Sequence, residues 1–186
     1  FIAKALGGKG AVVEIKGLPG SPPARDRSEG FREAIAGSPD IRIVHDPVAN
    51  WLREEAMAQM ESALSAHEKI DLVYAHNDPM AMGAFLAAKA KGRDGQMLFV
   101  GIDALPGLDG GRQAVADGKL SATFVYPTGG KEAIEVAEKI FKGCVDRGVI
   151  VRPVGSRIVV SPPLVISQGE CDKIVAAMTG AMSRVM

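Results

Sequence analysis

Short apolar runs alternate along the chain with longer stretches in which apolar residues recur every three or four positions. The short runs lack the apolar-polar alternation of a half-exposed strand, so each is typical of a strand that is buried on both faces. Six such strands are predicted, at residues 11–16, 41–44, 72–75, 97–102, 121–126 and 158–160. Helices are predicted at residues 1–7, 24–36, 51–66, 79–90, 131–142 and 170–184, with a short helix that ends at residue 116. This alternation predicts an α/β fold with a doubly wound, mostly parallel sheet in three layers.

The stretch from Asp71 to Gly83, DLVYAHNDPMAMG, joins one of these buried strands to a helix. Asp78 has the side chain of a helix N-cap, and Pro79 would then occupy the favoured first helical position. With the cap provided by Asp78, we expect Asn77 to lie at the tip of the turn and to be available to a ligand. Ligands of open α/β sheets bind at this carboxyl edge of the strands.

The composition gives little support to a charged partner. The chain has 186 residues, with 22 basic and 22 acidic side chains and no basic block, which argues against a nucleic-acid or anionic-membrane surface in this segment. No apolar run approaches the roughly 18–20 residues of a membrane span. The chain begins at Phe1 without a signal peptide, so we expect a processed or truncated start. Cys144 and Cys171 show no metal-ligand spacing and are either free thiols or a disulfide pair.

Sequence motifs of catalysis are not found. The glycine-rich segments at residues 7–10 and 17–20 match neither a P-loop nor a G-x-G-x-x-G fingerprint, and there is no G-x-S-x-G elbow. The histidines His45, His67 and His76 lack metal-ligand spacing, and isolated histidines are usually polar loop residues. No nucleophile stands beside an obvious base. We therefore expect a non-catalytic protein without a metal or a cofactor.

Side chains suited to a polyhydroxylated ligand occur where the predicted strands and their loops meet one edge of the sheet. These candidates are Arg27, Trp51, Asn77, Asp103 and Tyr126. A guanidinium, an amide and a carboxylate bind vicinal hydroxyls, and an aromatic ring packs on the C–H face of a sugar. Each candidate also has an ordinary alternative: Asn77 and Asp103 as helix caps, Arg27 as a surface charge, and the two aromatic residues as core.

Four segments together resemble the type I periplasmic sugar-binding proteins of the ribose-binding type, whose core is shared by the lactose-repressor family. The segments are GLPGSPPARDRSEGF, YAHNDPMAMGA, FVGIDALPG and DGKLSATFVYPTGG, and the likeness runs from Phe1 to about Gly143. The resemblance implies that Arg27 is the second arginine of the family's R-x-R-G-x-G-F segment, here with Ser28 in place of the first glycine.

The same resemblance implies roles for the other candidates. Trp51 matches the aromatic residue that stacks on the sugar ring, Asn77 the asparagine of N-D-x-M-A-x-G-A, and Asp103 the aspartate of V-G-x-D. Tyr126 falls where many members have a glutamine, which leaves the identity of the sugar open.

The resemblance further implies a domain organisation. Residues 1–128 would form the second lobe of a two-lobed binding protein, and residues 129–186 the returning C-terminal segment. The family's first lobe would lie outside this chain. Without that lobe, we expect the segment from Lys131 onward to pack on the sheet edge or on a partner chain, including a second copy.

The implied function is non-catalytic binding of a sugar or polyol by a periplasmic solute-binding protein that feeds the membrane permease of an ABC transporter. Two alternatives remain. One is the effector-sensing core of a cytoplasmic, sugar-responsive transcription regulator, and the other is the ligand-binding domain of a sensor kinase.

Overall fold

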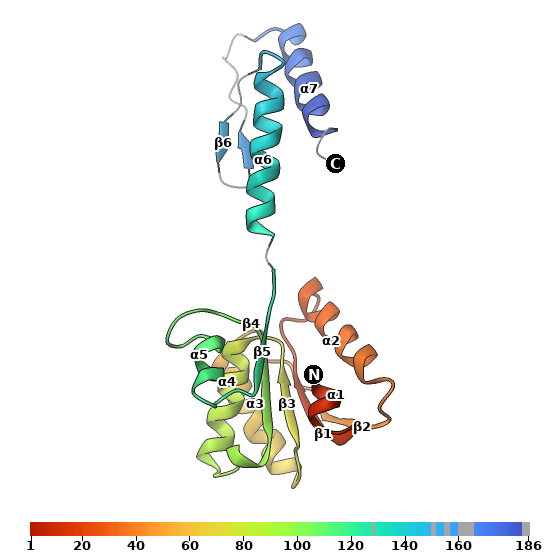
Figure 1. Cartoon of the computed structure of the whole chain (residues 1–186), viewed down its shortest axis with the longest axis vertical. Helices are drawn as coiled ribbons and strands as arrows, with labels where there is room; N and C mark the ends of the chain where they lie inside the picture. The colour runs from red at the N-terminus through yellow and green to blue at the C-terminus, as the bar shows by residue number, and fades with distance from the viewer. Residues whose placement is uncertain (128, 150–151, 155–156, 160–165, 184–186) are drawn as a thin grey trace. The chain divides into compact units, whose positions relative to one another are not determined.

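A computed structural model describes residues 1–127, 129–149, 152–154, 157–159 and 166–183 (Figure 1). The chain divides into two compact units, Phe1–Tyr126 and Pro127–Met186. The elements of the first unit are α1 (Ile2–Ala5), β1 (Lys9–Ile15), α2 (Pro22–Ile35), β2 (Asp40–His45), α3 (Arg53–Ala66), β3 (Leu72–Ala75), α4 (Asp78–Ala90), η1 (Asp94–Gln96), β4 (Leu98–Asp103), α5 (Gly111–Ala116) and β5 (Ala122–Val125).

The first unit is built on one parallel sheet with the strand order β2-β1-β3-β4-β5. The chain runs outward from β1 to β2, returns past β1 to β3, and continues in the opposite direction. The order therefore reverses between β1 and β3, and their carboxyl ends form the switch point at which such sheets bind ligands. The predicted α/β fold with a doubly wound parallel sheet is confirmed.

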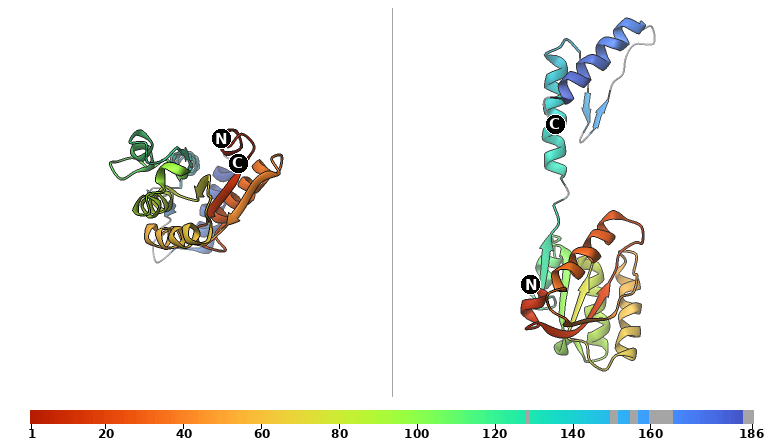
Figure 2. Two further views of the ribbon diagram at one scale, coloured as in Figure 1. Left: turned by 90° about the horizontal axis from the view of Figure 1, so that it is seen from below. Right: turned by 90° about the vertical axis from the view of Figure 1, so that its right-hand side faces the viewer.

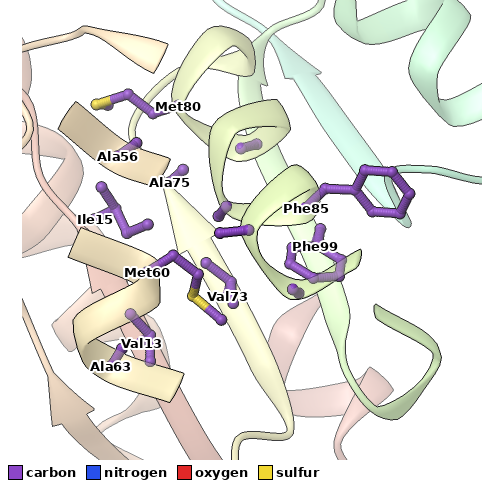
Figure 3. Close-up of a cluster of buried hydrophobic side chains, with 14 of the residues drawn as sticks. Val13, Ile15, Ala56, Met60, Ala63, Val73, Ala75, Met80, Phe85 and Phe99 are labelled. Carbon is purple, nitrogen blue, oxygen red and sulfur yellow. The ribbon is translucent and has the colours of Figure 1, made fainter. Parts of the chain in front are cut away.

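Helices cover both faces of this sheet, as Figure 1 and Figure 2 show. Because successive strand residues point to opposite faces, the strands contribute to two separate cores. One core packs under α1 and α2, with Val12, Phe31, Ile41, Leu72, Tyr74 and Val100 as its buried members. The other packs under α3, α4 and α5, where Val13, Met60 and Val73 meet, and Phe85 lies edge-on to Phe99 (Figure 3).

The start of helix α3 differs from the sequence prediction in a way that matters for Trp51. Helix α3 begins at Arg53 and not at Trp51. The backbone φ angles of Asn50 and Trp51 are 46° and 70°, and a right-handed helix cannot include residues in that region. Trp51 therefore belongs to the loop that precedes the helix.

The second unit contains α6 (Gly130–Val145), β6 (Arg152–Val154), β7 (Arg157–Val159) and α7 (Gln168–Met182). The two strands form an antiparallel hairpin, of which the sequence predicted only the second strand. The predicted ends of that strand at Val160 and of the last helix at Arg184 lie outside the described residues. Helices α6 and α7 pack on each other.

Arg147 joins α6 to α7. It donates to the carbonyl oxygens of Gly143, at 2.6 Å, and Gly180, at 2.9 Å. Cys144 is buried next to this contact, and burial raises the pKa of its thiol. Both Cys144 and Cys171 are free thiols, so the disulfide alternative is not realised in this structure.

None of the helices in the described part of the chain combines the length and the apolar character that a membrane span requires.

Candidate functional site

The structure brings all five predicted residues together at the carboxyl edge of the sheet. They come from five segments of the first unit: α2, the loop before α3, the turn after β3, the end of β4 and the residue after β5. The members, in that order, are Arg27, Trp51, Asn77, Asp103 and Tyr126. Each of them contacts at least one other member of the group. Their role in holding a ligand stays a prediction.

Arg27 is the centre of this group. Its Nη2 donates to Asp103 Oδ1 at 2.9 Å, and its Nη1 donates to the backbone carbonyl of His76. The guanidinium carbon lies 4.5 Å from the ring centroid of Tyr126 and 5.4 Å from that of Trp51, within the range of cation–π attraction. The side chain is only 11% exposed. Arg27 is therefore not the solvated surface charge that the sequence left open.

One nitrogen of this guanidinium differs from the other two. Arg27 Nε is buried and has no hydrogen-bond partner among the described residues. A buried donor without a partner is unfavourable unless another group completes it. Within the described part of the chain, the structure thus leaves one donor of this guanidinium unsatisfied and shielded from solvent.

Asn77 caps helix α4, which corrects the prediction that Asp78 does so. Asn77 Oδ1 accepts a hydrogen bond from the backbone nitrogen of Met80 at 2.9 Å, and the extended φ of −150° is typical of an N-cap. Its Nδ2 donates to the backbone carbonyl of Trp51 at 3.1 Å. An amide nitrogen carries two hydrogens, so one remains for a ligand. Capping and binding are thus compatible roles for Asn77.

Asp78 is the first residue of α4, and its role differs from the capping role that the sequence predicted. It is almost fully buried, and its Oδ2 accepts from the backbone nitrogen of Leu105 at 2.9 Å. Thr123 donates its hydroxyl to Asp78 Oδ1 and accepts from the backbone nitrogen of Ala104 at 3.1 Å. Burial raises the pKa of Asp78, while the bonds from Thr123 and Leu105 oppose that shift. Asp78 therefore ties the turn after β4 to β5.

That turn presents Asp103 in an unfavourable backbone conformation. The φ angles of Asp103 and Ala104 are 101° and 50°, a region that residues with a side chain rarely adopt. Strain of this kind persists only where the surrounding contacts hold it, and it is concentrated at functional sites. Asp103 does not cap α5, whose N-cap is Gly110. The structure thus removes the capping alternative for this carboxylate.

Trp51 packs directly on the backbone of Gly17, which lies two residues after the end of β1. A Cβ atom placed on Gly17 would lie 2.2 to 2.3 Å from three carbons of the indole ring, so only glycine leaves room for it. The ring is partly buried and also contacts the core under α3 and α4. Tyr126 is 45% exposed and is not a core residue.

A buried polar pair lies beneath the site, and our reading of the sequence missed it. His76, expected to be a polar loop residue, is completely buried together with Glu14. Its ring contacts Glu14 Oε1 at 3.2 Å, and Arg32 donates to the other carboxylate oxygen at 2.8 Å. Burial and the Glu14 carboxylate raise the pKa of the neighbouring Tyr74 to about 12, against a smaller opposing effect of Arg27. The signal in the sequence was a glutamate inside an apolar strand.

The arrangement offers a guanidinium, an amide, a carboxylate and two aromatic rings, which is the chemistry of polyol recognition. Among the described residues there is no group of three or more histidine, cysteine, aspartate or glutamate side chains that could hold a metal.

Comparison with known proteins gives a consistent result. Residues 1–143 match the family model described as a periplasmic binding protein domain. The ribose import binding protein of Salmonella typhimurium is 37% identical over 145 residues, covering 77% of this chain and 47% of the relative. The D-apiose import binding protein of Paraburkholderia graminis is 38% identical over 141 residues, covering 75% and 44%. The chain thus spans about half the length of the curated relatives it matches.

Solved structures agree with these relatives. The fructose-binding periplasmic domain of a hybrid two-component system has a TM-score of 0.74 and 39% identity, covering 99% of this chain and 59% of that one. A periplasmic solute-binding protein of an ABC transporter from Actinobacillus succinogenes, solved with D-allose, has a TM-score of 0.59 and 37% identity, covering 63% and 41%. With the parallel sheet and the matched residues, these findings show that the chain belongs to the periplasmic binding protein family, among its type I sugar-binding members.

Proposed function

We propose that the chain supplies one wall of a non-catalytic binding site for a sugar or related polyol, in a solute-binding protein of an ABC-type uptake system. The observation that carries this proposal is the position of Arg27. Its guanidinium meets the Asp103 carboxylate and two aromatic rings at the carboxyl edge of the sheet. Such a group suits a ring of vicinal hydroxyls and requires neither a metal nor a cofactor.

Asn77 and Asp103 complete the polar set. The second hydrogen of Asn77 Nδ2 and the Asp103 carboxylate, which is 27% exposed, provide a donor and an acceptor in the same group of residues as Arg27. A sugar hydroxyl both donates and accepts, so it can bond to both. The ribose and D-apiose import binding proteins among the relatives support this ligand class.

The proposed cleft has a second wall. Since the relatives are about twice as long as the aligned region, we propose that residues 1–128 form the second lobe and that a first lobe from outside these residues closes over the ligand. The 186-residue chain alone should then bind sugars weakly or not measurably.

Calorimetric titration tests both parts of this proposal. D-ribose, D-fructose, D-allose and myo-inositol are titrated into the chain and into a form that carries both lobes. Binding by the two-lobed form alone is the expected result. Micromolar binding by the chain alone would contradict the half-site, and no binding by the two-lobed form to any sugar or polyol would contradict the function.

A permease of an ABC transporter is the proposed partner, and the periplasm is the proposed location. Deleting the gene should abolish uptake of the bound sugar, and fractionation should recover the protein with periplasmic markers. A protein found in the cytoplasm would favour the core of a transcription regulator instead.

A sensor domain is the second candidate. It is favoured by the fructose-binding periplasmic domain of a two-component system, which aligns with 99% of this chain and therefore also with its second unit. Gene deletion separates the two candidates. Loss of sugar uptake supports the transport role, whereas loss of sugar-induced transcription with intact uptake supports the sensor.

We further propose that the second unit can associate with another copy of the chain. Apolar side chains on α6 and α7 are exposed, namely Ile134, Val136, Val145, Val175 and Met182. Exposed apolar surface of this kind promotes association. Light scattering should show dimers that the change Val175→Asp disrupts. A monomer at all concentrations would contradict this part of the proposal.

A further inference from the structure

Glu14 and His76 form a completely buried polar pair beneath the candidate site. Glu14 lies in β1, and His76 directly follows the end of the neighbouring strand β3. Residues of the apolar core under α2 lie beside them on these two strands. Burying a carboxylate is costly unless it is paired, and apolar residues of similar volume often fill such a place equally well. We propose that Glu14 and His76 are positioning residues that orient Trp51 and Arg27 for the ligand, an inference that rests on the proposed function.

The hydrogen bonds of His76 define its tautomer. The backbone nitrogen of Gly17 donates to His76 Nδ1 at 3.2 Å, so Nδ1 carries no hydrogen. The proton is therefore on Nε2, which donates to Glu14 Oε1 at 3.2 Å. Glu14 Oε2 accepts from Arg32 at 2.8 Å. The series of hydrogen bonds therefore runs from the Gly17 nitrogen through His76 and Glu14 to Arg32. The imidazole ring has a single orientation that satisfies all of these partners.

Two site residues depend on that orientation. Gly17, which His76 holds by its backbone nitrogen, is the surface on which the Trp51 ring packs. The backbone carbonyl of His76 accepts from Arg27, and the imidazole lies 6.2 Å from the Trp51 ring. A change in the position of His76 would thus alter the positions of Arg27 in α2 and of Trp51 in the loop before α3.

The loop that carries Trp51 is joined to the same end of β1. The backbone nitrogen of Lys16 donates to Pro47, and the nitrogen of Ala49 donates to Lys16, each at 2.8 Å. Outer ion pairs connect Asp46 to Arg32 at 3.1 Å and to Lys16 at 2.9 Å. These outer pairs are solvent-exposed and contribute little by themselves. The buried pair is the part of the network that can fix the geometry of the site.

Three variants of the 186-residue chain test this proposal. His76→Leu removes both ring contacts, whereas His76→Gln retains a donor that can reach Glu14. Glu14→Gln keeps the shape and an acceptor but loses the charge. Leu72→Ala is the matched control, because Leu72 is also completely buried in the same core but lies at the opposite end of β3.

Trp51 is the only tryptophan, so its fluorescence reports the site without any sugar. His76→Leu should shift the emission maximum and increase quenching by iodide, and His76→Gln should restore values close to those of the unchanged chain. Leu72→Ala should lose stability in urea but keep the Trp51 signals. In the two-lobed form, His76→Leu should weaken binding of D-ribose or D-fructose about tenfold or more.

Trp51 signals in His76→Leu that match those of Leu72→Ala would overturn the proposal. If His76→Leu does not fold, the Glu14→Gln variant tests the proposal in its place. Unchanged Trp51 emission and iodide quenching in Glu14→Gln would then overturn the positioning role. The fluorescence result does not depend on ligand binding. A protein that binds no sugar would therefore contradict the proposed function while the positioning role is still tested.

Discussion

The side-chain amide of Asn77 joins the start of helix α4 to the backbone of Trp51. Its oxygen accepts from the nitrogen of Met80 at 2.9 Å, and its nitrogen donates to the Trp51 carbonyl at 3.1 Å. Trp51 has a positive φ of 70°, which this bond helps to maintain. One residue therefore serves the stability of a helix and the shape of the candidate site.

These two roles of Asn77 can be separated. Asn77→Asp keeps the capping oxygen, so its free energy of unfolding should remain above that of Asn77→Ala, which should lose about 1–2 kcal/mol. Both variants lose the donor to the Trp51 carbonyl and should change the fluorescence of Trp51. Urea unfolding and emission spectra measure the two effects. Equal stability of Asn77→Asp and Asn77→Ala would show that the cap is unimportant.

Arg27 should not tolerate replacement by lysine. Arg27→Lys keeps the charge but cannot bond to both Asp103 and the His76 carbonyl in one plane, so we expect a stability loss of about 1–3 kcal/mol. Arg25→Lys is the control, because Arg25 is 63% exposed and, within the described residues, forms an ion pair with Asp26 on the surface. That change should stay within about 0.5 kcal/mol.

Binding of sugar by the two-lobed form should follow the same order, with Arg27→Lys weakened about tenfold or more. Equal affinity and stability in the two lysine variants would mean that the contacts of Arg27 do not matter.

The hydroxyl of Thr123 should stabilise the turn that presents Asp103. Thr123→Val leaves Asp78 Oδ1 and the Ala104 nitrogen without this partner, which should lower the free energy of unfolding by about 1–3 kcal/mol. Thr123→Ser retains the hydroxyl and should lose clearly less. Thermal and urea unfolding of the two variants measure the difference. If the valine variant is as stable as the serine variant, the hydrogen bonds that Thr123 forms with Asp78 and Ala104 do not stabilise the turn.

We expect the buried phenol of Tyr74 to make the protein less stable at alkaline pH. Its pKa is raised from 10.0 to about 12 by burial, so the folded chain holds the phenol proton more tightly than the unfolded chain does. The buried, neutral phenol of Tyr74 makes its full contribution to the free energy of unfolding below pH 10.0. This contribution is lost as the pH rises toward about 12. At about pH 11 the loss should be about 1.4 kcal/mol.

Urea midpoints of the unchanged chain, Tyr74→Phe and the control Tyr126→Phe, measured at about pH 9 and about pH 11, test this expectation. The alkaline loss should be smaller in Tyr74→Phe than in the other two proteins. The same loss in all three would exclude Tyr74 as its source.

The sheet and the grouping of the site residues could be predicted because both follow from local patterns. Each strand of the first unit is a short apolar run, and parallel strands bring their carboxyl ends to one edge. Arg27 and Asp103 are 76 residues apart, yet this rule and the family resemblance together predicted that both would lie at one site.

Other features depend on contacts that no local pattern reveals. Asparagine and aspartate cap helices about equally well, so the choice between Asn77 and Asp78 was made by the burial of Asp78 against Leu105, 27 residues further on. Glu14 and His76 are 62 residues apart and meet only after β1 and β3 have paired. Strand β6, Arg-Pro-Val, has no apolar run and contains a proline, which argues against a strand in sequence.

The anchoring of Arg27 has a thermodynamic consequence for recognition. A long side chain held by Asp103, a backbone carbonyl and two rings has lost its rotamer entropy on folding, an amount of about 2 kcal/mol. A sugar would not have to immobilise it again, so more of each contact would remain as affinity. A donor that cannot move also cannot follow a displaced hydroxyl. At the proposed sugar site, a rigid guanidinium would therefore favour discrimination between epimers, and a narrow range of ligands over a broad one.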